Sequence, residues 1–311
     1  MALNNRQDVI IIGGSYSGLS AAMALGRSLR NVLIIDGGKP CNRQTPHSHN
    51  FITHDGDKPA AIAAEAKKQV LAYETVKFIN DVVEDGIKAD HGFEITTAAN
   101  GTFRARRLIF ASGIKDIMPE IEGFAECWGI TAIHCPYCHG YEVRGEVTGI
   151  LADGDAAMHF APMISNLTKE LTVFTNGKSM LTDEQRGKLR NNNISVVEDE
   201  IKQFDHEKGY LKNIVFKSGS RFPVKAVYAR LPFVQNSDIP EKLGCKKNEL
   251  GLLEVDFMQR TNIPGVFAVG DTTVAMRSVA NAVATGSMAG AAVNNELCAE
   301  DFNASVPSSA K

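Results

Sequence analysis

Residues 8–18 read DVIIIGGSYSG, an apolar run that leads directly into a glycine-rich turn. The β-branched run at 8–12 predicts a buried strand, and the LSAAMALGRSLR segment after the turn has the composition and spacing of a helix. A second apolar run, NVLIID, follows and ends at Asp36. Together the three segments predict a β-α-β unit of about thirty residues, the arrangement found in dinucleotide-binding domains.

The turn carries the residues expected to contact a nucleotide. It follows the GxGxxG pattern except that Ser15 stands where the middle glycine normally lets a pyrophosphate approach the backbone. Serine is small, its hydroxyl can donate to a phosphate oxygen, and the phosphate is expected at the N-terminus of the next helix. Asp36 ends the second strand, where an acidic residue binds ribose hydroxyls. The expected cofactor contacts are Gly13, Gly14, Ser15, Ser17, Gly18 and Asp36; the alternative is a glycine turn in another α/β fold.

The composition indicates a globular protein of two domains. At 311 residues the chain exceeds what one hydrophobic core usually serves, and its 44% hydrophobic and 22% charged residues permit a sizeable core. The 33 basic and 36 acidic residues are spread along the chain, so we expect no nucleic-acid or anionic-membrane partner. No apolar stretch approaches the ~18 residues of a membrane span, and the first apolar run is too short for a signal peptide, so a cytoplasmic location is expected.

The β-α-β rhythm occurs twice. A second unit begins near Glu146 with the strand-like VTGILAD, a segment expected to be helical up to Pro162, and the strand ELTVFTN. Residues 77–97 alternate like strands, with Gly86 and Gly92 as turns. A strand at NIPGVFAVGD and a helix of small residues beginning near Arg277 follow. We therefore expect an α/β fold of two Rossmann-like nucleotide-binding domains, the second inserted into the first, with bounds 1–116 and 235–311 for the first and 117–234 for the second.

Residues 132–142, AIHCPYCHGYE, contain a CxxC motif, whereas the other four cysteines stand alone in sequence. A zinc site needs two further ligands at suitable spacing, and no second CxxC or HxxxH exists. Two thiols that merely pack together would be a coincidence beside a nucleotide-binding motif. In a redox dithiol the proline stiffens the turn, and the short spacing permits a disulfide. We therefore interpret Cys135 and Cys138 as a redox-active pair, with zinc and packed thiols as the alternatives.

Residues 261–271 read TNIPGVFAVGD, a strand that delivers Asp271 just before a helix. This segment resembles the flavoprotein disulfide reductases, in which the matching aspartate binds the ribitol of FAD. The resemblance implies that role for Asp271 and places Arg277, Ser278 and Val279 at the helix start that meets the pyrimidine edge of the flavin. A helix N-terminus supports negative charge on a reduced flavin. The family more often has glutamine at the position of Ser278, so contact there is expected mainly through the backbone.

With FAD motifs on both sides of the CxxC, the whole chain resembles the low-molecular-weight thioredoxin reductases. The resemblance implies that Cys138 faces the flavin and that Cys135 attacks the external disulfide. CPYCHGYE is similar to a sub-branch that includes the gliotoxin and holomycin dithiol oxidases, in which the histidine after the pair and an asparagine of the early loop assist catalysis. His139 and Asn42 occupy comparable places here. His139 stands where the reductases usually have aspartate, and a histidine can take a thiol proton near neutral pH.

The same resemblance implies further contacts and partners. FAD contacts are expected from Asn50, Ala111, Gly113 and Gly270, whereas the early-loop histidines His47, His49 and His54 are expected to be solvated. The substrate is expected to be a small dithiol or disulfide, or a thioredoxin-like protein. The protein is expected to be a homodimer, the commonest symmetric assembly.

Binding of NADPH is left uncertain by the sequence. In thioredoxin reductases the inserted domain carries its own GxGxxA turn and a basic cluster for the 2′-phosphate. Here the turn at 152–157 reads ADGDAA, which lacks the first glycine and places two carboxylates where a pyrophosphate would lie. The next strand is followed by Lys178 and no arginine, so fixed positive charge for a 2′-phosphate is weak.

Three hypotheses about function follow. The first is a FAD-dependent dithiol/disulfide oxidoreductase that exchanges electrons with something other than NADPH, such as oxygen or an electron-transfer protein. The second is an NADPH-dependent thioredoxin reductase with an unusual cofactor turn. The third is a non-catalytic flavin-binding redox sensor. The CPYC motif argues against the third, because a sensor needs no resolving cysteine.

Overall fold

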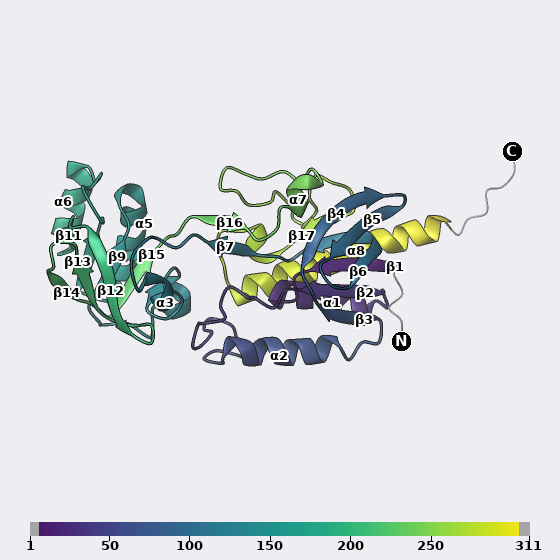
Figure 1. Cartoon of the computed structure of the whole chain (residues 1–311), viewed down its shortest axis with the longest axis horizontal. Coiled ribbons are helices and arrows are strands. Elements are labelled where there is room, and N and C mark those ends of the chain that lie inside the picture. Colours follow the sequence, from purple (N-terminus) through teal and green to yellow (C-terminus); the bar gives the residue numbers. More distant parts are fainter. Residues whose placement is uncertain (1–5, 305–311) are drawn as a thin grey trace, which may run out of the picture. The chain divides into compact units, whose positions relative to one another are not determined.

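The structure is a computed structural model that describes residues 6–304 and divides into two compact units. The described parts of the first unit are residues 6–41, 60–115 and 234–304, and the second unit contains residues 42–59 and 116–233. Both units combine parallel strands with helices, which confirms the predicted α/β fold (Figure 1). The second unit therefore includes the early loop at 42–59 as well as the inserted segment.

The first unit is built on a seven-stranded sheet of order β3-β2-β1-β6-β5-β4, with β17 paired to β6. The strands β1, β2, β3, β6 and β17 run parallel, and β4 and β5 are antiparallel. The element bounds are β1 Arg6–Ile12, α1 Tyr16–Arg27, β2 Val32–Asp36, α2 Pro59–Val70, β3 Val76–Asn80, β4 Val83–Ala89, β5 Gly92–Thr97, β6 Gly101–Phe110, α7 Ile239–Lys242, β17 Val266–Ala268, the 3-10 helix η1 Gly270–Thr272 and α8 Val279–Ala304.

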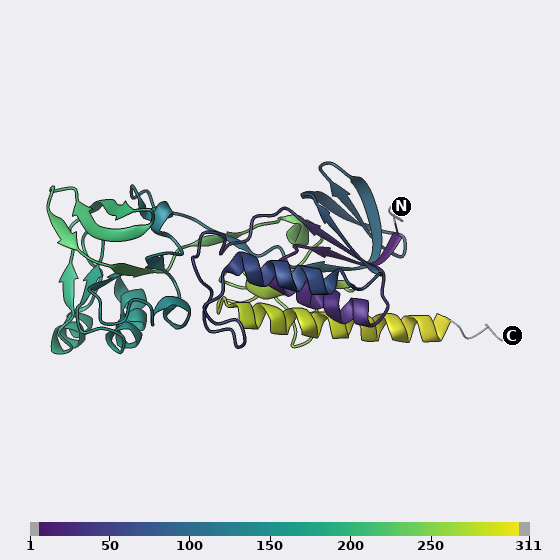
Figure 2. The same ribbon diagram turned by 90° about the horizontal axis from the view of Figure 1, so that it is seen from below.

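Alternating side chains of β1 fill the cores on both faces of this sheet. Val9 and Ile11 pack with Leu25 of α1 and Val293 of α8, while Ile10 and Ile12 belong to a second core on the other face. A continuous apolar run such as residues 9–12 of β1 is typical of a parallel sheet covered on both sides. Figure 2 shows α1, α2 and α8 along one face of the sheet.

The second unit contains a five-stranded parallel sheet and a three-stranded antiparallel sheet. The order of the parallel sheet is β11-β10-β9-β15-β8, and that of the antiparallel sheet is β12-β13-β14. The bounds are α3 Phe124–Cys127, β8 Ala132–Ile133, α4 Pro136–His139, β9 Thr148–Leu151, α5 Gly154–Ser165, β10 Leu171–Phe174, α6 Asp183–Asn191, β11 Ser195–Val197, β12 Ile201–Glu207, β13 Tyr210–Phe216, β14 Arg221–Pro223 and β15 Ala226–Ala229. Two short strands, β7 Ile114–Asp116 and β16 Phe233–Gln235, pair with each other where the chain passes between the units.

Two local predictions differ from the structure. Helix α5 continues through Pro162 to Ser165, because a proline in the last turn removes only one helical hydrogen bond. Gly92 directly follows the turn at residues 90–91 and begins β5, at φ +150°, whereas Gly86 lies inside β4. A Cβ atom at Gly86 would lie 2.7 Å from Cγ2 of Ile239, so this glycine is required by the close packing of α7 rather than by a turn.

Helices α1 and α8 pack with their backbones nearly in contact. A Cβ atom at Gly286 would lie 2.1 Å from the Ser17 carbonyl oxygen, and one at Gly290 would lie 2.7 Å from the Ala21 carbonyl oxygen. Backbone atoms cannot move aside as a flexible side chain can, so this spacing depends on glycine at both positions.

This packing predicts opposite effects of one substitution at two helical glycines. Gly286→Ala should lower the free energy of unfolding by about 1–3 kcal/mol, because overpacking outweighs the gain in helix propensity. Gly187→Ala in α6 is the matched control: nothing lies within 4 Å of the added Cβ, so it should stabilise by about 0.5–1 kcal/mol. Chemical denaturation of both variants measures the difference, and equal stability of the two would contradict the packing argument.

Candidate active site

The glycine turn after β1 is shaped by contacts that only glycine permits. Gly13 has φ +109°, and a Cβ there would lie 2.2 Å from the Ala111 carbonyl oxygen. A Cβ at Gly18 would lie 1.9 Å from the Gly13 carbonyl oxygen. Ser15 has φ −91°, a conformation open to any residue, so the departure from the GxGxxG pattern costs the backbone nothing.

The start of α1 is suited to an anion. Ser15 is its N-cap but makes no capping hydrogen bond through its side chain, and the first N–H groups of a helix have no partner within it. The buried Ser112 hydroxyl, next in the chain after Ala111, also has no hydrogen-bond partner within residues 6–304. Free N–H groups at a helix N-terminus bind phosphate. These residues therefore fit the pyrophosphate of a dinucleotide.

Asp36 lies at the end of β2, as expected, and its Oδ1 accepts a hydrogen bond of 3.0 Å from the Gly14 N–H. This bond ties the glycine turn to the neighbouring strand. The carboxylate is thus held at the carboxyl end of the parallel strands, the edge at which open α/β sheets bind ligands.

The carboxyl-terminal part of the first unit brings a second acidic residue to the start of α1. Gly270 has φ +70°, and a Cβ there would lie 2.7 Å from Oγ of Ser17 in α1. Asp271 follows in η1, and its Oδ2 lies 3.4 Å from Nε of Arg277 and 3.7 Å from the Cys41 sulfur. The Asp271 and Arg277 side chains are both largely buried.

Helix α8 begins at the expected place. Ser278 directly precedes it, and Oγ of Ser278 accepts a hydrogen bond from the Asn281 N–H at 3.1 Å. The nucleotide-contact residues predicted from the sequence thus fall within the first unit, with the exception of Asn50. They are Gly13, Gly14, Ser15, Ser17, Gly18, Asp36, Ala111, Gly113, Gly270, Asp271, Arg277, Ser278 and Val279.

The two cysteines of the CxxC motif lie together in the second unit. Cys135 is the N-cap of α4, Pro136 occupies the first helical position, and Cys138 lies one turn later. The two sulfur atoms are 2.6 Å apart. The short turn therefore brings the two sulfur atoms close enough together for a disulfide to form between them.

His139 ends α4 and is half-buried; both of its ring nitrogens are buried, and neither has a hydrogen-bond partner in the described part of the chain. Burial lowers the pKa of its imidazole below the ordinary value, the nearby Glu142 carboxylate raises it, and His49 lowers it. Burial has the largest effect of the three on this pKa, and it favours the uncharged form of the imidazole. The ring is therefore neutral at neutral pH and able to accept a proton.

Tyr228 lies beneath α4 and was not singled out by the sequence. A Cβ at Gly140 would lie 3.0 Å from Oη of Tyr228, and this buried hydroxyl has no hydrogen-bond partner among the residues the structure describes. Burial raises the pKa of Tyr228, and Cys135 and Glu142 raise it further. The phenol thus stays protonated beside the thiol pair. Its sequence context, AVYA in a buried strand, reads as ordinary core, so no sequence signal marked it.

The early loop at 42–59 is attached to the CxxC unit. Nε2 of Gln44 donates to the carbonyl oxygens of Ala125 and Trp128, at 3.0 and 2.5 Å. Asn42 accepts a backbone bond from Thr45, and the backbone N–H of Asn50, at φ +59°, donates to Asp55. Asn42 and Asn50 thus belong to the unit that carries the thiols. Their expected roles in catalysis and FAD binding stay predictions.

The second nucleotide-type turn, between β9 and α5, is capped by its own side chain. Oδ1 of Asp153 accepts hydrogen bonds from the Gly154 N–H at 2.7 Å and from Oγ of Ser179 at 2.9 Å. Oδ2 of the same carboxylate accepts from the Met180 N–H at 2.7 Å. Asp155 in the first helical turn accepts from Gln185. Two carboxylates therefore occupy the helix N-terminus.

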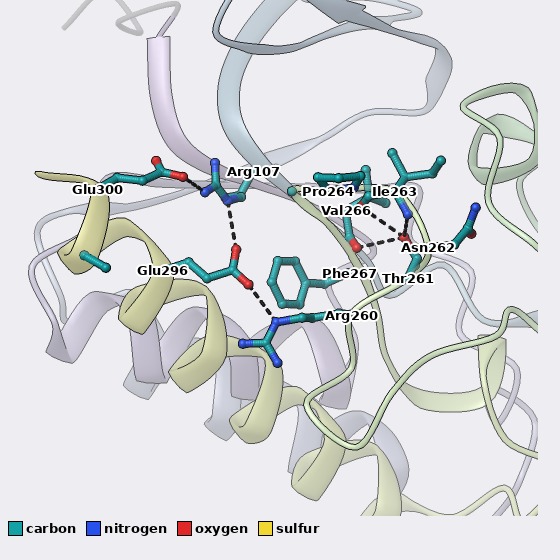
Figure 3. Close-up of a pocket in the computed structure, with 12 residues that line it drawn as sticks. Arg107, Arg260, Thr261, Asn262, Ile263, Pro264, Val266, Phe267, Glu296 and Glu300 are labelled. Carbon is teal, nitrogen blue, oxygen red and sulfur yellow. Dashed lines mark hydrogen bonds and ion pairs between the residues drawn. The ribbon is translucent and has the colours of Figure 1, made fainter. Parts of the chain in front are cut away.

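A pocket of about 540 Å³ lies elsewhere in the first unit, at the amino end of β17 (Figure 3). Arg107 pairs with Glu296 and Glu300, and Arg260 pairs with Glu296, so the charges that line this pocket neutralise each other. Ligands of open α/β sheets bind at the carboxyl ends of the strands. We therefore assign the pocket no part in the active site.

No helix within residues 6–304 has the length and apolar composition needed to cross a bilayer.

Comparison with known proteins agrees with this geometry. The chain is 32% identical to thioredoxin reductase tcpT of Claviceps purpurea, over 96% of this chain and 97% of the relative. Two solved structures are similar: an oxidoreductase of Agrobacterium tumefaciens (36% identity, 94% and 99% of the two chains, TM-score 0.88) and HlmI (30% identity, 98% and 97%, TM-score 0.91). The family model described as pyridine nucleotide-disulphide oxidoreductase matches residues 7–286. The chain therefore belongs to this family, as a thioredoxin-reductase-like enzyme with FAD as its cofactor.

Proposed function

We propose that the enzyme passes electrons between FAD and a substrate dithiol or disulfide through Cys135 and Cys138, without a normal NADPH site. The observation that carries the second half of this proposal is the Asp153 carboxylate, which caps the helix where a pyrophosphate would bind. The electron partner is then oxygen or an electron-transfer protein. The substrate is a small dithiol or disulfide, or a thioredoxin-like protein, and the active form is a homodimer.

The electrostatics of the second turn support this proposal. A pyrophosphate at the start of α5 would have to displace the Asp153 carboxylate from three hydrogen-bond donors, and Asp155 would still repel it. Beyond β10 the nearest arginine of α6, Arg186, is already paired with Glu198. Lys178 alone is a weak substitute for the bidentate arginines that usually hold a 2′-phosphate.

The thiol pair supplies the substrate step. In the direction of dithiol oxidation, a substrate thiolate attacks Sγ of Cys135 in the oxidised pair, the Cys135–Cys138 bond breaks, and the Cys138 thiolate leaves. The second substrate thiolate then breaks the mixed disulfide, which leaves the substrate oxidised by two electrons and the pair reduced. FAD, when bound, supplies the two-electron acceptor that restores the pair. His139, whose lowered pKa favours the uncharged imidazole, takes the proton of a thiol that must ionise.

An NADPH-dependent thioredoxin reductase is the second candidate, and the names of relatives such as tcpT favour it. The two candidates differ in what reduces the flavin. Under anaerobic conditions, excess NADPH should leave the visible absorption band of the oxidised flavin largely unbleached. Dithiothreitol added to the same sample should bleach it through the thiol pair and so serves as the control. Bleaching by NADPH as fast as by dithiothreitol would favour the second candidate.

The roles of the two cysteines predict different spectra for their serine variants. Cys138→Ser should abolish dithiol turnover and retain FAD, whereas Cys135→Ser should leave a thiolate beside the flavin and a long-wavelength charge-transfer band. Cys298→Ser, at an exposed cysteine of the other unit, is the control and should keep wild-type turnover. Absorption spectra and steady-state assays distinguish the three, and a charge-transfer band in Cys138→Ser instead would exchange the two roles.

Asp271 is expected to bind the ribitol of FAD, so its loss should weaken flavin binding rather than folding. Loss of a hydrogen bond to a charged group costs about 1.5–3 kcal/mol, which corresponds to roughly 10–100-fold weaker binding. Asp238→Ala, which removes an exposed carboxylate paired with Lys242, is the matched control. FAD titration of the apoproteins measures both, and unchanged affinity in Asp271→Ala would show that the assignment is wrong.

A further inference from the structure

Gln235 ends β16 and bonds to the segment that carries Asp271, within the first unit. Its Nε2 donates to the carbonyl oxygens of Thr272 and Gly251, at 3.1 and 2.9 Å. Its Oε1 accepts a hydrogen bond from the Thr272 hydroxyl. Thr272 directly follows Asp271 and is fully buried. One side chain thus holds both polar groups of the residue next to the expected ribitol ligand.

Asn236, the next residue, bonds to a different segment of the same unit. Its backbone N–H donates to the Gly113 carbonyl oxygen at 3.2 Å, and its Nδ2 donates to the Ser112 carbonyl oxygen at 2.9 Å. These bonds engage the backbone of this segment. The buried Ser112 hydroxyl has no partner among residues 6–304, and a buried hydroxyl without a partner fits a ligand oxygen.

Both segments lie just past the end of a strand pair. The parallel strands β6 and β17 are in register as far as Phe110 and Ala268. Beyond these residues the chain continues to Ser112 from β6 and to Asp271 from β17, at the carboxyl ends where open α/β sheets bind ligands. Gln235 and Asn236 therefore supply hydrogen bonds at the point where the ladder between the two strands no longer does.

We propose that Gln235 and Asn236 are positioning residues for FAD and that each fixes one end of its site. Gln235 fixes the ribitol end at Asp271, and Asn236 fixes the pyrophosphate end at Ser112 and Gly113. A segment that is already held in place loses less conformational freedom when the cofactor binds, so its ligand binds more tightly. The proposal concerns cofactor binding alone and goes beyond the proposed function, since it holds whichever electron partner the flavin uses.

The test compares the FAD and ADP affinities of the apoproteins of Gln235→Met, Asn236→Ala and the wild type. Methionine keeps the length of the glutamine side chain and removes its hydrogen bonds. ADP carries a pyrophosphate but no ribitol, so it reports on one end of the site only. Gln235→Met should bind FAD about 3–10-fold more weakly and bind ADP as the wild type does, whereas Asn236→Ala should weaken both ligands by about threefold.

Asn262→Ala is the matched control in the same unit. The Asn262 side chain donates to the Gly244 carbonyl oxygen at 2.9 Å and accepts from the Lys246 N–H at 2.8 Å, so it also joins two backbone segments. It lies at the amino end of β17, away from the proposed site. This variant should keep the wild-type affinity for both ligands, and urea denaturation of each apoprotein measures stability separately.

A role confined to folding predicts a different result, namely lower stability with unchanged affinity of the folded apoproteins for FAD. That result would overturn the proposal, and so would an equal loss of affinity in Asn262→Ala. Equal losses of FAD and ADP binding in Gln235→Met would also overturn it, because Gln235 would then not act at the ribitol end. If Gln235→Met does not fold, the near-isosteric Thr272→Val removes the hydroxyl bond from the other side and should show the same preference for FAD loss.

Discussion

The first unit depends on the near-contact between the backbones of α1 and the carboxyl-terminal third of the chain. A side chain on Gly286 would collide with the Ser17 carbonyl oxygen. A side chain on Gly270 would collide with the Ser17 hydroxyl. Through these contacts, Asp271 and the start of α8 are brought to the glycine turn more than 250 residues earlier in the chain. The residues predicted to contact the pyrophosphate and the ribitol of FAD thus lie in one unit, as a cofactor that spans both requires.

The two nucleotide-type turns show how the same local fold can keep or lose an anion site. Both lie between a parallel strand and a helix of 12 residues. In the first, Ser15 leaves the helix N-terminus without a side-chain cap. In the second, Asp153 supplies a carboxylate that bonds to Gly154, Ser179 and Met180. The Asp153 carboxylate bonds to one N–H group of the helix and places a negative charge at its N-terminus, as a phosphate would, so capping from within competes with a ligand.

The sequence predicted the elements whose signals are local. The strand–turn–helix at 8–27, the acidic end of β2 and the CxxC turn depend on residues close in the chain, and the structure confirms each as an element. The features that could not be predicted from the sequence depend on contacts between distant segments. Gly86 was predicted to be a turn because nothing near it in sequence indicates α7, and Tyr228 was not singled out because only the fold places its hydroxyl near Gly140.

The early loop shows the same limit. His47, His49 and His54 look alike in sequence, but they have different partners in the folded loop, which is attached to α3 through Gln44. The hydrogen bond between Gln44 and Ala125 joins residues that are 81 positions apart, and no local sequence pattern predicts it. The roles of Asn42 and Asn50 depend on a bound cofactor and substrate, so they stay predictions.

The residue type at position 139 bears on the direction of electron flow. Burial favours the neutral form of any ionisable side chain, which makes a buried carboxyl a proton donor and a buried imidazole a proton acceptor. Reduction of a disulfide consumes protons and oxidation of a dithiol releases them, so the first suits an aspartate after the pair and the second suits His139. The imidazole here is buried and its pKa is lowered, although Glu142 partly opposes the shift. The lowered pKa leaves the imidazole in the form that accepts a proton from a substrate dithiol, and dithiol oxidation is the direction of electron flow in the function that we propose.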